Sequence, residues 1–492
     1  MRSASTTMAC THSLESVPVT IVLNDVHSAL NPTPVRRVER PRTLDELRSL
    51  VHRARSEGFG LSVAGGRHAM GAQQFATNQV HVDTTAMCAV LGSDASRGWL
   101  RVEAGAMWPA IIEATHRMPA SADGTAWAIR QKQTGVDDVT LGGSIAANAH
   151  GRGLQMQPLV DDIEDLALVD PQGDVVTCSR TEHPELFAKV VGGYGLFGIV
   201  HAATLRLTPR RKVRRLVDVL DLADARHAVL RRVEQGCLYG DFQFVIDPRD
   251  PAFLQRGVFA CYRPVDADDD VAIDAAADLR PEDWLKLLRL AAVDKAAAFK
   301  AYAQHYLGTH GNAYWADTMQ LATYLPSYAD ALSSEATASG VTPEANVRET
   351  LVIGEHYVPR DRIDAFMRGA RNVLLRHQAE VIYGTIRAIE RDSTSFMPWA
   401  RDDYACVIFN LRTPHTPQGK QRTADTFRAL IDTALALDGS YFLTYHHHAT
   451  REQVLRAYPQ MPDFFAAKRA HDPHAVFVSD WYHHHTRLLE AA

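Results

Sequence analysis

Between Thr43 and Gly58, apolar residues recur at the spacing of a helix face. Leu47, Leu50, Val51 and Ala54 supply that face. Thr43 and Glu46 form a capping box, in which the Thr43 hydroxyl accepts the Glu46 amide proton and Glu46 reaches back, and Gly58 is placed to end the helix. The pattern therefore predicts a helix up to Gly58, followed by a short strand over 61–64.

That strand runs directly into the glycines of Ala64-Gly-Gly-Arg-His-Ala69. A turn of this kind exposes backbone N–H groups and can form a nest for an anion. Two interpretations of its histidine stay open from the residues alone. His68 is either a nucleophile that bonds to a bound cofactor or a solvated histidine on a tight turn.

A second glycine-rich segment, 140–151, is interpreted as a turn whose small residues let the backbone approach a flat ligand. After it the pattern predicts a hairpin (163–169 and 175–178), a helix (184–191) and a strand (199–207). The glycines at 193, 195 and 198 match the dinucleotide fingerprint G-x-G-x-x-G, but a helix precedes them and a strand follows. This order is the reverse of a Rossmann site, so that interpretation is rejected.

From about residue 213 to 440, helical and strand-like stretches alternate, which indicates an α+β segment with an antiparallel sheet. The predicted helices are 283–306, 359–376 and 423–437, and the predicted strands are 242–246, 350–358 and 404–411. Glu355 and Tyr357 share one face of their strand, opposite His356. Arg387 also lies in an alternating, strand-like stretch, where a solvated or salt-bridged arginine is the default.

Two histidine triplets, 446–448 and 483–485, suggest a metal site. On a strand, consecutive side chains point to opposite faces, so one triplet cannot supply three converging ligands. No metal is expected.

Composition narrows the class of protein. The chain has 492 residues, 46% of them hydrophobic, and a net charge of −6, which argues against a basic face for nucleic acid. The first thirty residues lack the apolar run typical of a signal peptide, no run of 18 apolar residues occurs, and the six cysteines form no C-x-x-C pair. We expect a cytoplasmic protein with reduced thiols and no membrane span, as a monomer or homodimer.

Four motifs, taken in order, resemble a known family. They are P-x-T-x-x-E-L from Pro41, A-G-G-R-H from Ala64, L-G-G-S-I-A-A-N-A-H-G from Leu141 and G-G-Y-G-L-F-G-I-V from Gly192. Together they resemble the FAD domain of the vanillyl-alcohol-oxidase/p-cresol-methylhydroxylase superfamily, nearest its alditol-oxidase, aldonolactone-oxidase and glycolate-oxidase-like branch. The tail around Phe464 and Phe477 resembles the family's C-terminal segment.

The resemblance implies a two-domain α+β fold with a PCMH-type FAD-binding domain and an antiparallel-sheet cap. The implied boundaries are 1–212 for the FAD domain, 213–449 for the cap and 450–492 for a segment returning to the FAD domain. It also implies FAD attached through His68 by an 8α-histidyl bond. No cysteine lies between Cys88 and Cys178 to make a second attachment.

The implied cofactor-binding residues are Ala64, Gly65, Gly66, Arg67, His68, Ala69, Thr140, Gly142, Gly143, Ser144, Ala147, Asn148, Ala149, His150, Gly151, Gly195, Gly198 and Val200. The implied catalytic residues are Arg387, Glu355, and Tyr445 or His446 as the base. Three departures from the alditol oxidases, at Thr385, Val407 and Tyr445 to His447, argue against a simple sugar alcohol.

The resulting hypothesis is an FAD-dependent oxidase or dehydrogenase that oxidises a CH–OH group of a small alcohol, polyol, sugar or lactone. O₂, gated by the size of Ala149, or another acceptor would reoxidise the flavin. The alternatives are a flavin-dependent C–C reductase or desaturase of the sterol-reductase-like type and a degenerate FAD-binding protein.

Overall fold

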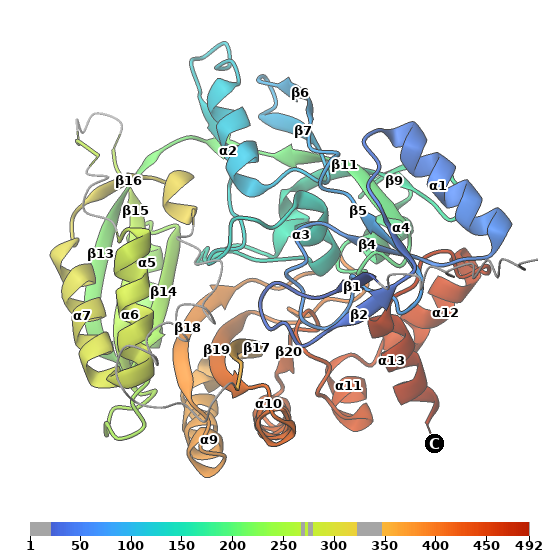
Figure 1. The fold of residues 1–492 in the computed structure, drawn as a ribbon. Coiled ribbons are helices and arrows are strands. Elements are labelled where there is room, and N and C mark those ends of the chain that lie inside the picture. Colours follow the sequence, from blue (N-terminus) through green and yellow to red (C-terminus); the bar gives the residue numbers. More distant parts are fainter. Residues whose placement is uncertain (1–20, 267–270, 274–278, 322–346, 492) are drawn as a thin grey trace, which may run out of the picture.

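The computed structural model describes residues 21–266, 271–273, 279–321 and 347–491. The N-terminal segment without a signal-peptide pattern, which contains Cys10, lies largely outside the described residues. Figure 1 shows α+β architecture, with several small sheets and helices from the two ends of the chain on one side and a large sheet from the middle of the chain on the other.

The first unit follows the sequence pattern closely. Helix α1 (Leu44–Glu57) begins at Thr43, whose hydroxyl accepts the Glu46 amide proton at 3.2 Å, and ends at Gly58 in the left-handed region (φ 71°). The four predicted core residues are buried. One half of the capping box differs, because the Glu46 carboxylate accepts from the backbone N–H of Arg42 rather than from Thr43.

Helix α1 precedes the edge strand of a small parallel sheet. The order is β3-β5-β4, formed by β3 (Arg37–Glu39), β5 (Val80–Asp83) and β4 (Leu61–Ala64). A hairpin of β1 (Ile21–Leu23) and β2 (Thr33–Val35) precedes it. Strand β4 ends where the first glycine turn begins.

A five-stranded antiparallel sheet with order β10-β9-β11-β7-β6 follows. Its strands are β6 (Val90–Asp94), β7 (Trp99–Glu103), β9 (Ile163–Val169), β10 (Val175–Ser179) and β11 (Ile199–Arg206). The predicted hairpin, helix and strand of this region are confirmed, the helix being α4 (Pro184–Val190). Helix α2 (Trp108–Arg117) and the short pair β8 (Trp127–Ala128) and β12 (Thr208–Pro209) complete the region.

The second glycine segment was predicted as a turn, and that prediction is wrong in part. Residues Leu141–Ala147 form helix α3, capped by the Thr140 hydroxyl, which accepts from Gly143 N–H at 3.1 Å. Only Asn148 adopts the left-handed conformation (φ 49°) that turns the chain out of the helix. The small residues that suggested a turn also allow this helix to pack closely, since a Cβ on Gly142 would lie 3.0 Å from that of Ala104.

An eight-stranded antiparallel sheet forms the middle of the chain, with order β16-β13-β15-β14-β18-β19-β17-β20. The strands are β13 (Lys212–Asp221), β14 (Tyr239–Phe244), β15 (Arg256–Pro264), β16 (Ala313–Trp315), β17 (Glu349–Pro359), β18 (Val381–Ile389), β19 (Tyr404–Pro414) and β20 (Ser440–Tyr441). Directly paired residues in a sheet share a face. Cross-strand pairing of Glu355 with Ile408, and of Ile408 with Thr385, therefore puts these residues on the face opposite His356.

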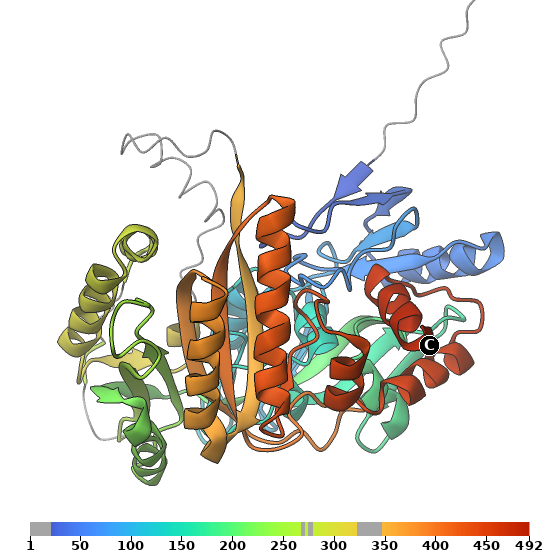
Figure 2. The ribbon, with the colours of Figure 1, turned by 90° about the horizontal axis from the view of Figure 1, so that it is seen from below.

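Helices cover both faces of this sheet. Helices α9 (Ile363–Arg376) and α10 (Pro417–Leu435) lie side by side against this sheet, as Figure 2 shows. They cover the His356 face, since the His356 ring contacts Phe366 of α9 and Phe427 of α10, and α5 (Leu222–Glu234) belongs to the same core. On the other face Tyr302 and Tyr306 pack against Val258 and Ala260. The predicted single helix 283–306 is two helices, α6 (Pro281–Val293) and α7 (Lys295–Gly308), separated at Asp294.

The chain finally returns to its beginning through α11 (Arg451–Ala457), α12 (Met461–His471) and α13 (Asp480–Glu490). The backbone N–H of Leu61 donates to Val476 at 2.7 Å, and Val478 donates back to Leu61 at 3.0 Å. Val476 and Phe477 are buried in the core that α1 and β4 share. None of the helices in the described ranges is long and apolar enough to span a bilayer.

Candidate functional site

A cavity of about 820 Å³ lies between the glycine segments and the inner face of the eight-stranded sheet. This volume falls in the range typical of ligand sites, roughly 300–1,000 Å³. A second cavity of about 60 Å³ shares Val63, Ala64 and Gly65 with it and continues towards Gly198 and Val200. The two cavities therefore adjoin at these residues, and glycines and alanines make up most of the lining of the smaller one.

The two glycine segments lie against each other. A Cβ on Gly65 would lie 2.0 Å from the Thr140 hydroxyl oxygen, and one on Gly66 would lie 2.1 Å from the Asp138 carbonyl. Any side chain at either position would therefore force the segments apart. The glycines are needed for this close approach, and they leave the backbone exposed along the cavity wall.

Most of the cofactor-binding residues implied by the sequence line these cavities. In the larger cavity they are Ala64, Gly65, Gly66, Arg67, His68, Ala69, Thr140, Gly143, Ser144, Ala147, Ala149 and Gly195. Gly142, Gly198 and Val200 line the smaller one. The glycines and small side chains of this lining let the backbone approach a ligand closely, which fits a molecule with a flat ring system and a pyrophosphate.

Three residues of that implied set lie behind the wall instead. The side chain of Asn148 is fully engaged inside the protein, since it donates to Asp392 and accepts from Val160 N–H, both at 2.9 Å. Gly151 packs on Lys132, whose carbonyl would lie 2.9 Å from an added Cβ. His150 is buried and reaches the site only through Glu355. These residues support the wall rather than form it.

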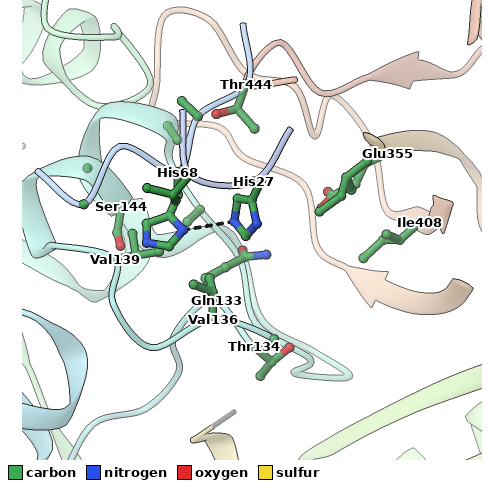
Figure 3. Close-up of a pocket in the computed structure, with 18 of the residues that line it drawn as sticks. His27, His68, Gln133, Thr134, Val136, Val139, Ser144, Glu355, Ile408 and Thr444 are labelled. Atoms are coloured by element: carbon green, nitrogen blue, oxygen red, sulfur yellow. Dashed lines mark hydrogen bonds between the residues drawn. The ribbon is translucent and has the colours of Figure 1, made fainter. Parts of the chain in front are cut away.

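His68 contacts a histidine that the sequence pattern did not single out. Its Nδ1 lies 2.9 Å from Nε2 of His27 (Figure 3). Burial lowers the pKa of His68 below its usual value of 6.5, and burial together with His68 lowers the pKa of His27 to about 3. Both rings are therefore neutral near pH 7.

His27 lies in a loop that is held together by the hydrogen bonds of Asp25. The carboxylate of buried Asp25 accepts from the Ser28 N–H at 2.6 Å, from the Ser28 hydroxyl and from Asn31 Nδ2. No periodicity marks this segment. The one available signal was the Asn24-Asp25 pair, which is typical of turns.

Glu355 organises the opposite wall of the cavity (Figure 3). Its Oε1 accepts from the Tyr445 hydroxyl at 2.5 Å, and its Oε2 accepts from the Tyr357 hydroxyl at 2.8 Å and contacts His150 Nε2 at 2.9 Å. Burial acts to raise the pKa of Glu355, but His150, Tyr445 and Arg387 outweigh it and lower the pKa to about 2. The carboxylate is thus ionised, and burial and its charge raise the pKa of Tyr445 well above 10.

Arg387 lies on the same face of the sheet, on the second strand from Glu355. Its side chain lines the cavity and is only 8% exposed. Its Nε and Nη1 atoms are buried and have no hydrogen-bond partner among the described residues. A buried guanidinium in this state indicates a place for a negatively charged or strongly accepting group.

His446, the other candidate base, is not among the residues that line the cavity. Its Nε2 lies 2.9 Å from the Ser28 hydroxyl, and burial lowers its pKa to about 4. The strand assumption for the triplets was also wrong, since 446–448 lie in a loop and 483–485 in α13. The fold brings the triplets together, with the rings of His447 and His484 4.1 Å apart between centroids.

One group of side chains has the composition of a metal site. His150, Glu355 and Cys406 bring a nitrogen, an oxygen and a sulfur within 4.8 Å of one another. Hydrogen bonds from Tyr357 and Tyr445 already occupy the carboxylate, and burial raises the pKa of the Cys406 thiol well above 9, so the thiolate that binds metals is disfavoured. We interpret the group as a hydrogen-bonded support for Glu355.

Part of the chain is similar to known proteins. Residues 35–179 match the family described as FAD binding domain. The chain is 30% identical over 172 residues to an uncharacterized oxidoreductase of the fasciation locus of Rhodococcoides fascians. This alignment covers 34% of this chain and 36% of that protein. It is 29% identical over 173 residues to cytokinin dehydrogenase 2 of Arabidopsis thaliana, covering 34% of this chain and 33% of the relative.

The chain thus aligns with about a third of the length of these relatives. The matches identify an FAD-binding domain and relate the chain to flavoprotein oxidoreductases, as the motifs implied. They point to the wider superfamily rather than to its alditol-oxidase branch.

Proposed function

We propose that the protein is an FAD-dependent oxidoreductase that oxidises a CH–OH group of a small organic substrate. The observation that carries this proposal is the 2.5 Å hydrogen bond between Tyr445 and ionised Glu355 at the wall of a cavity whose other wall is an FAD-binding domain. FAD supplies the two-electron acceptor for such a reaction. The protein has to supply a base, a positive charge and a dry site.

The base in this proposal is Tyr445 acting together with Glu355. The Tyr445 hydroxyl donates a hydrogen bond to Glu355, which leaves the lone pairs of the phenol oxygen free to face a substrate hydroxyl. When the substrate proton moves to Tyr445, the Tyr445 proton can move to Glu355. His150 and Tyr357 hold Glu355 in place for this transfer.

Arg387 is the proposed electrostatic element. Its unpartnered donors lie near Glu355 and can stabilise negative charge that develops on the substrate oxygen or on the bound cofactor. On the opposite wall, neutral His68 is the proposed attachment site for FAD. His27, which contacts its Nδ1, would leave Nε2 of His68 as the nucleophilic atom.

A second candidate substrate follows from the relatives that are named cytokinin dehydrogenases. The same cavity and flavin domain could serve oxidation of a cytokinin. Because the alignment covers about a third of those proteins, it favours this substrate less strongly than the cavity chemistry favours a hydroxyl donor.

The decisive experiment is anaerobic reduction of the protein-bound flavin, followed by its visible absorbance. We expect a panel of primary and secondary alcohols, polyols and hydroxy acids to contain compounds that bleach the flavin, and a cytokinin not to. Bleaching by a cytokinin alone would favour the second candidate. Protein that purifies without flavin and cannot be reconstituted with FAD would contradict both.

Two variants assign the base in the same assay. Tyr445→Phe should slow flavin reduction by about 100-fold or more, the size expected for loss of general base catalysis, without loss of flavin. His446→Gln is the matched comparison, since His446 neighbours Tyr445 in sequence but does not line the cavity. A larger effect at His446 than at Tyr445 would overturn this assignment.

A further inference from the structure

The cavity extends past Arg387 into a compartment between the sheet and α6–α7. Tyr383 and Asp241, on neighbouring strands β18 and β14, continue the inner face of the sheet there, and Tyr302 and Tyr306 of α7 also line the cavity. In Figure 1 helices α6 and α7 lie beside β13, β14 and β15 at this end. We call this part of the cavity the tyrosine compartment, defined by Tyr262, Tyr302, Tyr306 and Tyr383.

Its walls are flat, aromatic and held in place. The rings of Tyr302 and Tyr306 lie 4.4 Å apart between centroids. Arg215 fixes two of the walls, since its Nε donates to the Tyr262 hydroxyl at 3.1 Å and its guanidinium lies 5.0 Å from the Tyr306 ring centroid. Such a compartment fits a flat or aromatic group, because rigid aromatic walls offer a large apolar area at little cost in side-chain entropy.

The charge facing the cavity is positive, although the whole chain carries −6. Five arginines (Arg67, Arg152, Arg215, Arg348 and Arg387) and two carboxylates (Asp241 and Glu355) line it. Arg67 belongs to the first glycine turn, and Arg215 donates a hydrogen bond to Tyr262. Arg152, Arg348 and Arg387 remain, against two carboxylates in the cavity as a whole.

Two guanidinium groups there have buried donors that the described protein does not satisfy. Arg387 has Nε and Nη1 without a partner, and Arg152 has Nε without one. Arg152 is otherwise engaged with Asp241 at 3.4 Å and the Met319 carbonyl at 2.6 Å. Tyr383 lies within electrostatic reach of both arginines and of Asp241.

An unsatisfied buried guanidinium destabilises the protein unless a ligand supplies acceptors. A carboxylate matches the planar, forked donors of arginine better than a neutral hydroxyl does. We propose that the substrate is a hydroxy acid with an aromatic or similarly flat body, its carboxylate held by Arg387 beside Arg152 and its body in the tyrosine compartment. This inference rests on the proposed function and specifies its substrate class.

The reaction balances with groups already assigned. The C–H bond of the CH–OH carbon breaks and its electron pair passes, as a hydride, to the FAD of the proposed function. The O–H proton goes to the Tyr445–Glu355 pair, and a C=O bond forms, so that the hydroxy acid becomes an oxo acid. The carboxylate of the substrate is unchanged and serves only for binding.

The test compares two unreactive ligands that differ in charge and hardly in shape, phenylacetate and phenylacetamide. Their affinities for the FAD-loaded protein are measured by calorimetry and by the shift that they cause in flavin absorbance. We expect the acid to bind roughly 10- to 100-fold more tightly, the range of one charge-assisted hydrogen-bonded contact. Arg387→Gln should abolish this preference.

The matched control is Arg263→Gln. Arg263 is exposed on β15, on the strand that also carries Tyr262, and does not line the cavity. It should leave the preference for the acid unchanged. If Arg387→Gln fails to fold, Arg387→Lys replaces it, and that variant should bind the acid more weakly while still preferring it to the amide.

Equal binding of the two ligands by the wild-type protein overturns the inference. The inference is also overturned if Arg387→Gln still prefers the acid to the amide and its bound flavin has an altered spectrum. In that case the partner of Arg387 would be the flavin and not the carboxylate of the substrate. Either result leaves the proposed function intact if neutral alcohols still bleach the flavin. Absence of flavin, by contrast, counts against the proposed function itself.

Discussion

His68 and His27 illustrate how much a single contact adds to a motif. The motif placed His68 on a glycine turn, and the structure adds a second imidazole 2.9 Å from its Nδ1. A buried, neutral ring that makes a hydrogen bond through one nitrogen can present the lone pair of the other. That is the state a nucleophilic histidine requires.

Replacement of His68 by alanine tests this role. In the wild-type protein, we expect yellow colour to remain in the pellet after acid precipitation, because the flavin is attached covalently. His68→Ala should release the colour into the supernatant while the flavin still binds before acid is added. His474→Ala, at an exposed histidine, is the control and should keep the colour in the pellet.

Colour that stays in the pellet with His68→Ala would place the attachment at another residue. Colour released from the wild-type protein would mean that FAD is bound without a covalent bond, and His68 would then be a residue of the cavity wall only.

The sequence predicted residues whose role depends on local backbone, and it missed those that depend on long-range contacts. The glycines and the shared face of Glu355 and Tyr357 follow from turn chemistry and from strand alternation. The Glu355–Tyr445 bond joins residues 90 positions apart in the sequence, and no local pattern encodes it. For the same reason His150 was expected in the cavity wall rather than behind it.

At the scale of elements, the split between α6 and α7 shows the limit of helical periodicity. Both helices were predicted as one, because apolar residues continue through the break. Asp294 interrupts them: its side chain accepts from Ala297 N–H at 3.0 Å and caps α7, while its backbone N–H still bonds to Leu290 at the end of α6. The break lets α7 turn Tyr302 and Tyr306 towards the sheet.

Replacement of Asp294 by alanine should loosen the start of α7 alone. Loss of an N-cap costs about 1 kcal/mol, equivalent to roughly fivefold faster opening. We expect hydrogen exchange of the amides in the first turn of α7 to speed up by about that factor, measured by mass spectrometry or NMR. The first turn of α6, capped separately around Arg280 and Asp283, is the internal control. Equal acceleration in both helices would show that they open as a single unit.

For the molecule as a whole, the architecture could be predicted further than the site. The antiparallel sheet in the middle of the chain, α1 and β4 near its start, and the hairpin, helix and strand after the second glycine segment are as the pattern predicted. The strands β5 to β8 and helix α2 were not predicted. The order of the strands could not be predicted, because β14 and β18 are neighbours in the sheet although β15, α6, α7, β16, β17 and α9 all lie between them in the sequence. Such pairing depends on the packing of both faces, which period alone does not specify.

The whole molecule also buries several histidines in neutral form. Burial lowers the pKa to about 3 for His27, His356 and His485 and to about 4 for His81, His446 and His484. Of these, His356 packs among the rings of Phe366, Phe409 and Phe427, on the face of the sheet away from the cavity.

Stability should therefore fall as pH is lowered below 6.5. Between pH 6.5 and about 3, residue 356 carries a proton in the unfolded chain but not in the folded one, so protons favour unfolding. Each such histidine lowers the free energy of unfolding by about 1.4 kcal/mol per pH unit in that window. The free energy of unfolding is measured by urea unfolding at several pH values. His356→Phe should reduce the slope of this free energy against pH by the contribution of one histidine, about 1.4 kcal/mol per pH unit.

The control for this slope is His474→Phe, which changes an exposed histidine. An unchanged slope for His356→Phe would mean that His356 is protonated in the folded protein.

The pairing of Leu61 with residues 476 to 478 also governs the order of events during synthesis. Strand β4 leaves the ribosome about four hundred residues before the segment that completes its edge, a delay of roughly 20–80 s at ~5–20 residues per second. Throughout this interval the small parallel sheet has an open flank at β4, the strand that leads straight into the glycine turn. The eight-stranded sheet is translated in the meantime, so the flank beside the glycine turn is completed only after that sheet has emerged.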